Sequence, residues 1–357
     1  MGAEVPAAED DALSVPAAAR PYAPSWLDRA VTAIDRLPGP VWLAYLVFGV
    51  LALAWTSSVG WLGGYIPVGT FDFTQSSYAF FLVFPFALLH VLDRAAARAI
   101  WGFSPALEVT PAELARLEYE MTTIPARPAL ALALAGALLD FVSWVGDPEG
   151  AGFIIGTAPA GLIVRAAGEY LLVSAWLVLM YQVYRQLRLV ARLHGRASRI
   201  DLFRPGPLYA FSHLTVRAGI GFVAAAAWTL LTTPVDLFFT PLNIGFLLVV
   251  VAIGVAAFVV PLRGMQGRLA AEKAGLIDAT NERLETTIGR LHDAVDRDDL
   301  DRADALNKTL ASLVQEREIL GHLRTWPWDP STLRAFASAI ALPIGLWLVT
   351  RLLERSL

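Results

Sequence analysis

The sequence predicts an all-α membrane protein, with several transmembrane helices and a helical hairpin outside the bilayer. Of its 357 residues, 56% are apolar and 17% are charged, and the mean hydropathy is +0.54. A soluble fold of this size has too little interior for so much apolar side chain, so most of it must face lipid. Apolar stretches also recur at about 20 residues, the length of a helix that crosses about 30 Å of hydrocarbon.

Composition excludes several classes of protein and site. The net charge of −4 argues against a nucleic-acid partner. The chain has no cysteine, which excludes disulfides and thiolate metal sites, and its 5 histidines form no local chelating motif, so we expect no metal. We find no Walker, GxGxxG, HExxH or GxSxG motif. We therefore expect neither an enzyme nor a cofactor.

Seven stretches are apolar enough to be membrane spans. They are Val41–Leu62, Ser76–Leu92, Pro128–Gly146, Gly161–Tyr184, Leu208–Thr233, Leu242–Leu262 and Leu333–Leu353. The seventh is interrupted by Pro343 and flanked by Arg334 and Arg351, which leaves open whether it crosses the membrane or is re-entrant.

Arginine predicts the orientation, because it stays cytoplasmic in short loops. Arginines cluster after the second and fourth spans, whereas Gly63–Gln75, Asp147–Ala160 and Pro234–Pro241 contain no lysine or arginine. We therefore expect a multi-pass protein of the cell membrane with a cytoplasmic N-terminus.

Four regions follow from this plan: a disordered tail, 1–24; a six-helix transmembrane bundle with cytoplasmic helical loops, 25–262; a cytoplasmic helical hairpin, 263–324; and an elbow with a C-terminal transmembrane helix, 325–357. Within the bundle region, Thr110 and Glu113 form a capping box that starts a short helix. In the hairpin, apolar residues such as Leu284, Ile288 and Leu291 form a coiled-coil-like seam. The hairpin is either an internal strut or an oligomerisation stem.

Four charged residues lie inside predicted spans and are therefore functional hypotheses by default. They are Asp140, Arg165, Glu169 and Arg217. Counted from the span ends, Asp140 and Arg165 share one depth, and Glu169 and Arg217 share another. This matching favours a neutral network that binds three helices together; an ion or substrate path through the acids is the alternative.

The plan resembles the seven-transmembrane ion-channel superfamily that includes insect odorant and gustatory receptors. The similarity lies in the inside N-terminus, the short outer and long inner loops, and the hairpin that returns through Leu300–Arg324 and the WPWDP elbow to Leu333–Leu353. The resemblance implies a homo-oligomer whose last helices line a central pore. Its pore-facing and packing positions would be divided among Ser338, Ile340, Pro343, Ile344 and Trp347.

Three functions stay open at this point. The first is an oligomeric ion-channel-like protein with an apolar constriction in its last helix. The second is a secondary transporter that uses Asp140, Glu169 and Arg217. The third is a non-transporting scaffold or sensor whose hairpin binds a cytosolic protein. The expected partners are the lipid bilayer and further copies of the chain, with an unidentified ion or small ligand.

Overall fold

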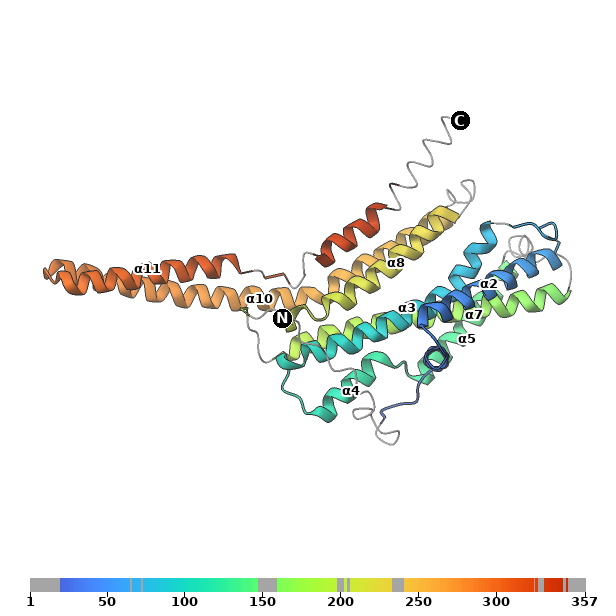
Figure 1. Ribbon diagram of the computed structural model, residues 1–357, viewed down its shortest axis with the longest axis horizontal. Helices are drawn as coiled ribbons and strands as arrows, with labels where there is room; N and C mark the ends of the chain where they lie inside the picture. The colour runs from blue at the N-terminus through green and yellow to red at the C-terminus, as the bar shows by residue number, and fades with distance from the viewer. Residues whose placement is uncertain are drawn as a thin grey trace, which may run out of the picture.

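The computed structural model, drawn in Figure 1, is a helical bundle from which one long hairpin projects. It describes residues 20–64, 66–71, 73–146, 159–197, 202–203, 206–232, 241–323, 325–326, 331–342 and 345. Within these ranges there is no strand, only an isolated bridge between Pro24 and Pro125. The all-α class is confirmed.

The helices are, in chain order, α1 (Trp26–Asp35), α2 (Val41–Leu62), α3 (Phe73–Phe103), α4 (Pro111–Thr122), α5 (Ala126–Gly146), α7 (Pro159–Arg196), α8 (Ser212–Thr232), α10 (Pro241–Asp296) and α11 (Leu300–His322). Two 3₁₀ turns, η2 (Ser104–Ala106) and η3 (Pro207–Tyr209), and a helix over Ser331–Leu342 complete the described elements. The capping box predicted at Thr110 is present: its hydroxyl accepts from the backbone N–H of Glu113.

Five described helices are long and apolar enough to cross a membrane. They overlap the first, second, fourth, fifth and sixth predicted spans. Several long apolar helices of this kind suit a membrane-embedded protein. The third predicted span forms α5, which is not among the five. The described part of the seventh is the shorter helix Ser331–Leu342. The count of seven spans therefore stays a prediction.

Apolar side chains on the outside of the bundle indicate which helices meet lipid. On α2, Trp42, Val50 and Leu51 expose 66%, 60% and 62% of their surface. By contrast, α3 is the central helix, because α2, α7, α8 and α4 all pack against it. A soluble protein of this size would cover so long an apolar helix face, so the exposed face of α2 belongs against hydrocarbon.

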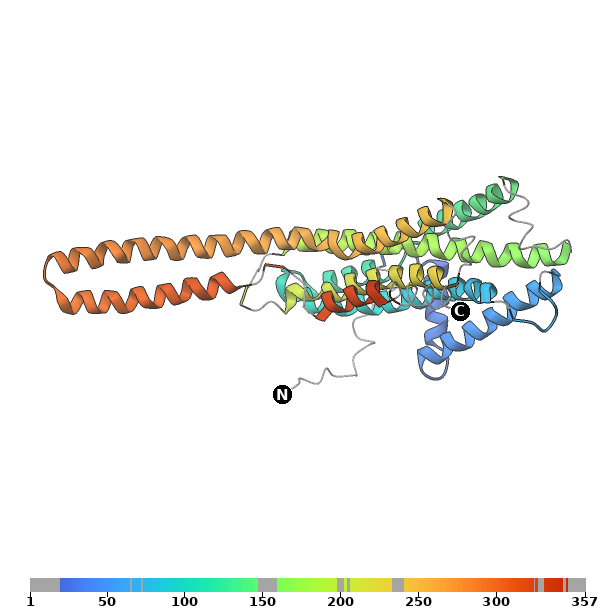
Figure 2. The ribbon, with the colours of Figure 1, turned by 90° about the horizontal axis from the view of Figure 1, so that it is seen from above.

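Helix α10 ties the bundle to the hairpin, because it runs without a break from Pro241 to Asp296. The predicted boundary between bundle and hairpin, at 262/263, falls inside this helix, directly after the internal Pro261. The part beyond residue 262 extends by about 50 Å at 1.5 Å per residue. Figures 1 and 2 show α11 returning antiparallel along it.

The tip of the hairpin is a short turn at the acidic run predicted to end the first arm. Asp298 adopts a left-handed backbone conformation, with φ at 59°. Aspartate tolerates this region better than most residues. The side chain of Asp299 then accepts from the backbone N–H of Arg302 and caps α11.

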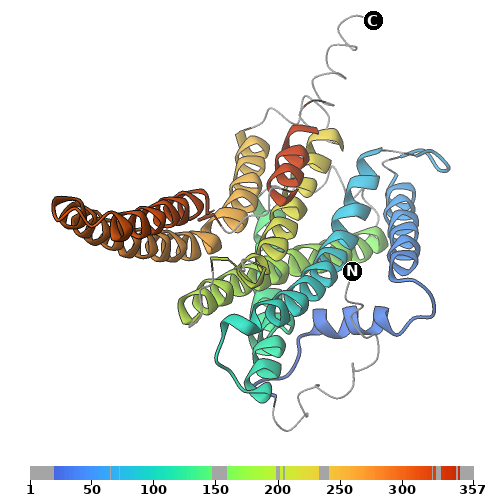
Figure 3. The same cartoon turned by 60° about the vertical axis from the view of Figure 1, so that its left-hand side comes forward.

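Helices α8 and α10 approach each other closely at two glycines, and the helix Ser331–Leu342 covers the contact. A Cβ atom on Gly254 would lie 3.2 Å from the carbonyl oxygen of Gly219. Phe336 packs against Phe258 of α10, with ring centroids 4.4 Å apart. Figure 3 shows the three helices side by side. Small residues at such crossings allow the helix backbones to approach.

Replacing Gly219 by alanine should weaken this contact. The new Cβ would lie 2.7 Å from the Phe336 ring and 3.0 Å from the Gly254 carbonyl oxygen, so helices must shift. Overpacking of this kind costs about 1–3 kcal/mol, which we expect to lower Tm in detergent by a few degrees. The control is Gly275→Ala, where nothing lies within 4 Å and Tm should hold or rise. Equal effects of the two substitutions would contradict the close contact.

Candidate functional site

Three of the four predicted intramembrane charges, Asp140, Glu169 and Arg217, have described side chains. Helices α5 and α7 pack together, and Gly136 meets Ser174 at their crossing. Counted outward from that crossing, Asp140 on α5 and Glu169 on α7 reach the same level to within one residue. Both side chains are partly buried. The structure thus brings two acids to one level of a packed helix pair.

The two arginines of the predicted network lie elsewhere or outside the described part. Arg217 lies on α8 and interacts electrostatically with Arg98 of α3. Glu169 lies about 25 Å up α7 from Gln186, which bonds Asp93, one turn before Arg98 on α3. The structure therefore does not match Glu169 with Arg217. The side chain of Arg165 is outside the described residues, although its backbone belongs to α7.

The predicted pore positions are only partly described. Ser338 is exposed, on the side of its helix opposite the buried Phe336. Ile340 is partly buried against the cluster that contains Phe336. Pro343, Ile344 and Trp347 lie outside the described residues.

A cluster of polar side chains, absent from the predicted sites, lies where α1 crosses the bundle. Helix α1 is seen end-on in Figure 1 and lengthwise in Figure 3, so it lies across the other helices. Leu27 and Val31 are buried beneath it. Its polar residues line a cavity shared with α3 and α4.

The first turn of α1 is fixed by Asp28. One carboxylate oxygen, Oδ2, accepts from the Ser25 hydroxyl at 2.7 Å, the Ser25 backbone N–H at 2.8 Å and the Ile124 backbone N–H at 3.0 Å. Ser25 Oγ in turn accepts from the Asp28 N–H, which completes a capping box. The bond to Ile124 joins α1 to the segment between α4 and α5.

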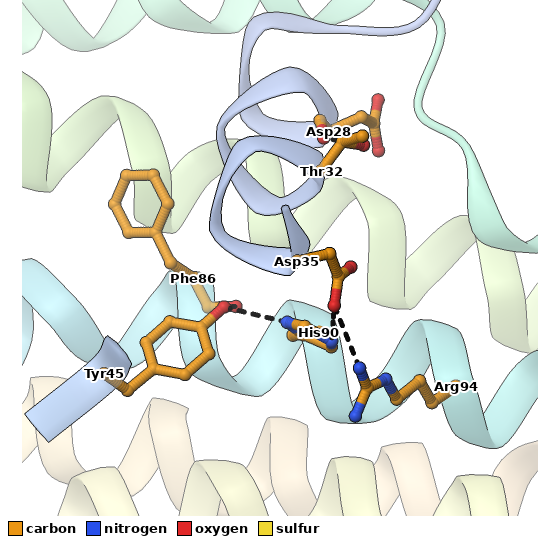
Figure 4. A network of polar contacts seen from close by, with 7 residues as sticks. All are labelled: Asp28, Thr32, Asp35, Tyr45, Phe86, His90 and Arg94. Carbon is orange, nitrogen blue, oxygen red and sulfur yellow. Dashed lines mark hydrogen bonds and ion pairs between the residues drawn. The ribbon is translucent and has the colours of Figure 1, made fainter. Parts of the chain in front are cut away.

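The last turn of α1 is fixed by Asp35, as Figure 4 shows. Asp35 Oδ1 lies 3.2 Å from His90 Nε2 and accepts from the Arg94 guanidinium at 2.9 Å. His90 is buried, and its Nδ1 lies 3.2 Å from the Tyr45 hydroxyl. The same hydroxyl donates to the Phe86 carbonyl at 3.0 Å. The end of α1 is thereby joined to α2 and α3 together.

Behind α1, two buried glutamines of α7 hold Asp93 and the end of α4. Gln182 and Gln186 each donate to the Met121 carbonyl, at 2.9 and 3.0 Å, and Gln186 also donates to Asp93 at 3.0 Å. Buried amides with satisfied partners fix geometry, because an unmade bond there is expensive. The positions of α3, α4 and α7 relative to one another are therefore fixed by polar contacts.

Arg185 anchors the segment before α1. Its guanidinium donates to the Thr123 carbonyl at 2.6 Å and to the Tyr22 hydroxyl, and it stacks over the Tyr22 ring at 5.1 Å. Tyr119 donates to the Tyr22 carbonyl at 2.8 Å. Residues 20–24, placed in the predicted disordered tail, are thus held by long-range contacts that composition does not reveal.

Burial alters the acidity of two groups of this cluster outside the spans. Burial raises the pKa of Asp28 above its ordinary value, against the opposing effect of its hydrogen bonds to Ser25 and Ile124. Burial also raises the pKa of Tyr22 to about 12, although the neighbouring Arg185 opposes this. Tyr22 therefore stays protonated and neutral at physiological pH.

A polar cavity of about 610 Å³ opens between α1, α3 and α4. Charged side chains of both signs line it, among them Asp28, Arg29, Asp35, Arg36 and Arg94. Its volume lies within the range of small-molecule sites. Among the described residues, no group of three histidine or acidic side chains is placed to hold a metal ion.

Comparisons with models of known families, with curated proteins and with solved structures find no match for this chain.

Replacing Arg185 by methionine should release the segment around Tyr22. The change removes charge-assisted bonds to Tyr22 and Thr123, each worth about 1.5–3 kcal/mol. We expect chymotrypsin to cleave after Tyr22 about tenfold faster in native-state digestion. The control is Arg188→Met, which removes an exposed charge from the next turn of α7. Equal cleavage rates in both variants would show that Arg185 does not hold the segment.

The pH dependence of stability tests the raised pKa of Asp28. Folded Asp28 binds its proton more tightly than the unfolded chain, whose carboxyl titrates near 3.8. Between that value and the raised pKa, the contribution of Asp28 to stability falls as the pH rises. The Tm of the native protein minus that of Asp28→Asn should therefore decrease with rising pH across this window and then level off. An increase with pH would mean that the carboxylate is stabilised by folding.

Proposed function

We propose that the protein is an oligomeric, channel-like membrane protein in which the last helix lies near the axis and the hairpin joins the subunits. One observation carries this proposal: apolar side chains are exposed along the hairpin, from its tip to the end of α11. Val295, Val314 and Ile319 expose 54%, 53% and 51% of their surface. Two helices alone cannot enclose a core, so a further copy of the hairpin is the natural cover.

The described part of the last helix supports the same arrangement. One face packs through Phe336 and Ile340 on α8 and α10. The opposite face carries Arg334, Ser338 and Ala341, all exposed. A polar and small-residue face turned away from its own bundle suits a water-filled path or a symmetric contact with other copies.

Continuity of the chain adds a mechanical argument. The hairpin is the direct extension of α10, and α10 contacts the last helix through Phe258 and Phe336. Lys273 of α10 also donates to the Gly321 and Leu323 carbonyls, at 2.6 and 2.8 Å, where α11 ends. A change in the association of the hairpins would therefore be passed to the helix near the axis.

The mass of the purified particle and its ion flux test the proposal together. Ile288→Asp with Val295→Asp places two charges on the exposed apolar face of α10 and should reduce the particle to a single chain in detergent. The control, Thr286→Asp with His292→Asp, adds the same charge at exposed polar positions of α10 and should leave the mass unchanged. A monomeric native protein would contradict the oligomer.

In liposomes, Ser338→Trp should block or strongly reduce ion flux, whereas Leu333→Trp, at the side of the same helix, should not. Native flux that is unaffected by Ser338→Trp would exclude the last helix as the path. Saturable flux abolished by Glu169→Gln would instead favour the transporter.

A further inference from the structure

We propose that the polar cavity between α1, α3 and α4 binds a group carrying both a phosphate and a primary ammonium, the chemistry of an ethanolamine phospholipid headgroup or of free phosphoethanolamine. This inference goes beyond the proposed function and does not depend on it, because the cavity belongs to a single chain.

The level of the cavity suits a headgroup. The hydroxyl of Tyr45, in the second turn of α2, contacts His90, so the start of α2 lies level with His90. Because α2 is a single apolar span, its first turn marks one boundary of the hydrocarbon. The exposed Trp42 at that turn suits the interfacial belt. The cavity, lined by His90 and Arg94, therefore opens where lipid phosphates lie.

Arginines supply the anion-binding side of the cavity. Arg29 and Arg36 lie two helical turns apart on α1, with Thr32 between them on the same face, and all three line the cavity. Both arginines are exposed, and neither has a carboxylate partner among the described residues. Arg94, in contrast, is engaged by Asp35. Two guanidinium groups and a hydroxyl on one face match the bidentate recognition of phosphate.

Asp28 supplies the complementary acceptor. Its Oδ2 accepts the hydrogen bonds from Ser25 and Ile124, whereas its Oδ1 is buried and has no hydrogen-bond partner in the described part of the chain. A buried acceptor without a donor costs about 1–3 kcal/mol, and an ammonium N–H is the donor that best suits a carboxylate. Asp28 is adjacent to Arg29, so the two charges of one small zwitterion can be met together.

Thermal unfolding of the full-length protein in detergent tests the site with O-phosphoethanolamine, inorganic phosphate and ethanolamine at matched ionic strength. We expect a saturable rise in Tm with phosphoethanolamine, at a half-saturating concentration at least about tenfold below that of either fragment. Equal potency of inorganic phosphate would overturn the proposal in favour of a simple anion site. No saturable shift with any probe, in detergent or in lipid nanodiscs, would also overturn it.

The arginine pair gives the decisive variant, because both side chains are exposed and line the cavity. Arg29→Gln with Arg36→Gln should leave the ligand-free Tm unchanged and weaken the phosphoethanolamine response by about tenfold or more. The matched control is Arg283→Gln with Arg290→Gln, two exposed arginines at the same spacing on α10, which should respond as the native protein does. An undiminished response in the α1 pair would overturn the site.

Nanodiscs distinguish the two sources of the ligand. If the headgroup is the occupant, phosphatidylethanolamine should stabilise the native protein more than phosphatidylcholine, because the phosphatidylcholine ammonium has no N–H donors. This difference should be lost in the variant that lacks Arg29 and Arg36. Equal stability in both lipids, with an undiminished response to soluble phosphoethanolamine, would identify the free compound instead.

Discussion

Helix α10 joins the bundle and the hairpin as one unbroken helix, and its path determines where the hairpin lies. Inside hydrocarbon every backbone group must be bonded within its own helix, so a span cannot end until it reaches water. Helix α10 goes further and continues past Pro261 into the hairpin. His194 lies buried at this proline, with its Nδ1 3.2 Å from the Pro261 carbonyl oxygen, and Arg268 donates to the His194 and Ala197 carbonyls. Helix α7 and the residue that follows it thereby hold α10 at its proline and again two turns beyond it, at Arg268.

Two kinds of interaction divide the bundle. Near the crossing of α8 and α10 the contacts are apolar and close, and glycines set the distance between the helices. Where α1 and α4 pack on α3 and α7, the contacts are polar and specific: the helices are joined through Asp28, Asp35, Arg185 and the paired glutamines. Apolar contacts tolerate sliding, whereas satisfied buried polar groups fix one register. The polar cluster therefore fixes the positions of these helices along their axes.

The sequence predicts the helices well and their polar partners poorly. Apolar runs and the Thr110 capping box are local signals, and the corresponding helices are present. Helix depth is not local: α3, α7 and α10 run beyond the apolar stretch that reveals them, so residues counted from the ends of apolar stretches do not give relative depths. The cluster around α1 joins residues as distant as Tyr22 and Arg185, and only the Ser25 and Asp28 capping pattern could have indicated α1 in advance.

Spin-label accessibility can establish whether α10 passes from hydrocarbon into water as one helix, because the chain has no cysteine and single cysteines can be introduced one at a time. In nanodiscs, labels at Leu248 and Val255 should be reached by dissolved oxygen and protected from a water-soluble nickel reagent. Labels at Gly275 and His292 should show the reverse, on a helix without a break between them. Protection of His292 from the nickel reagent, or a mobile break in α10 after Pro261, would show that α10 does not run unbroken from hydrocarbon into water.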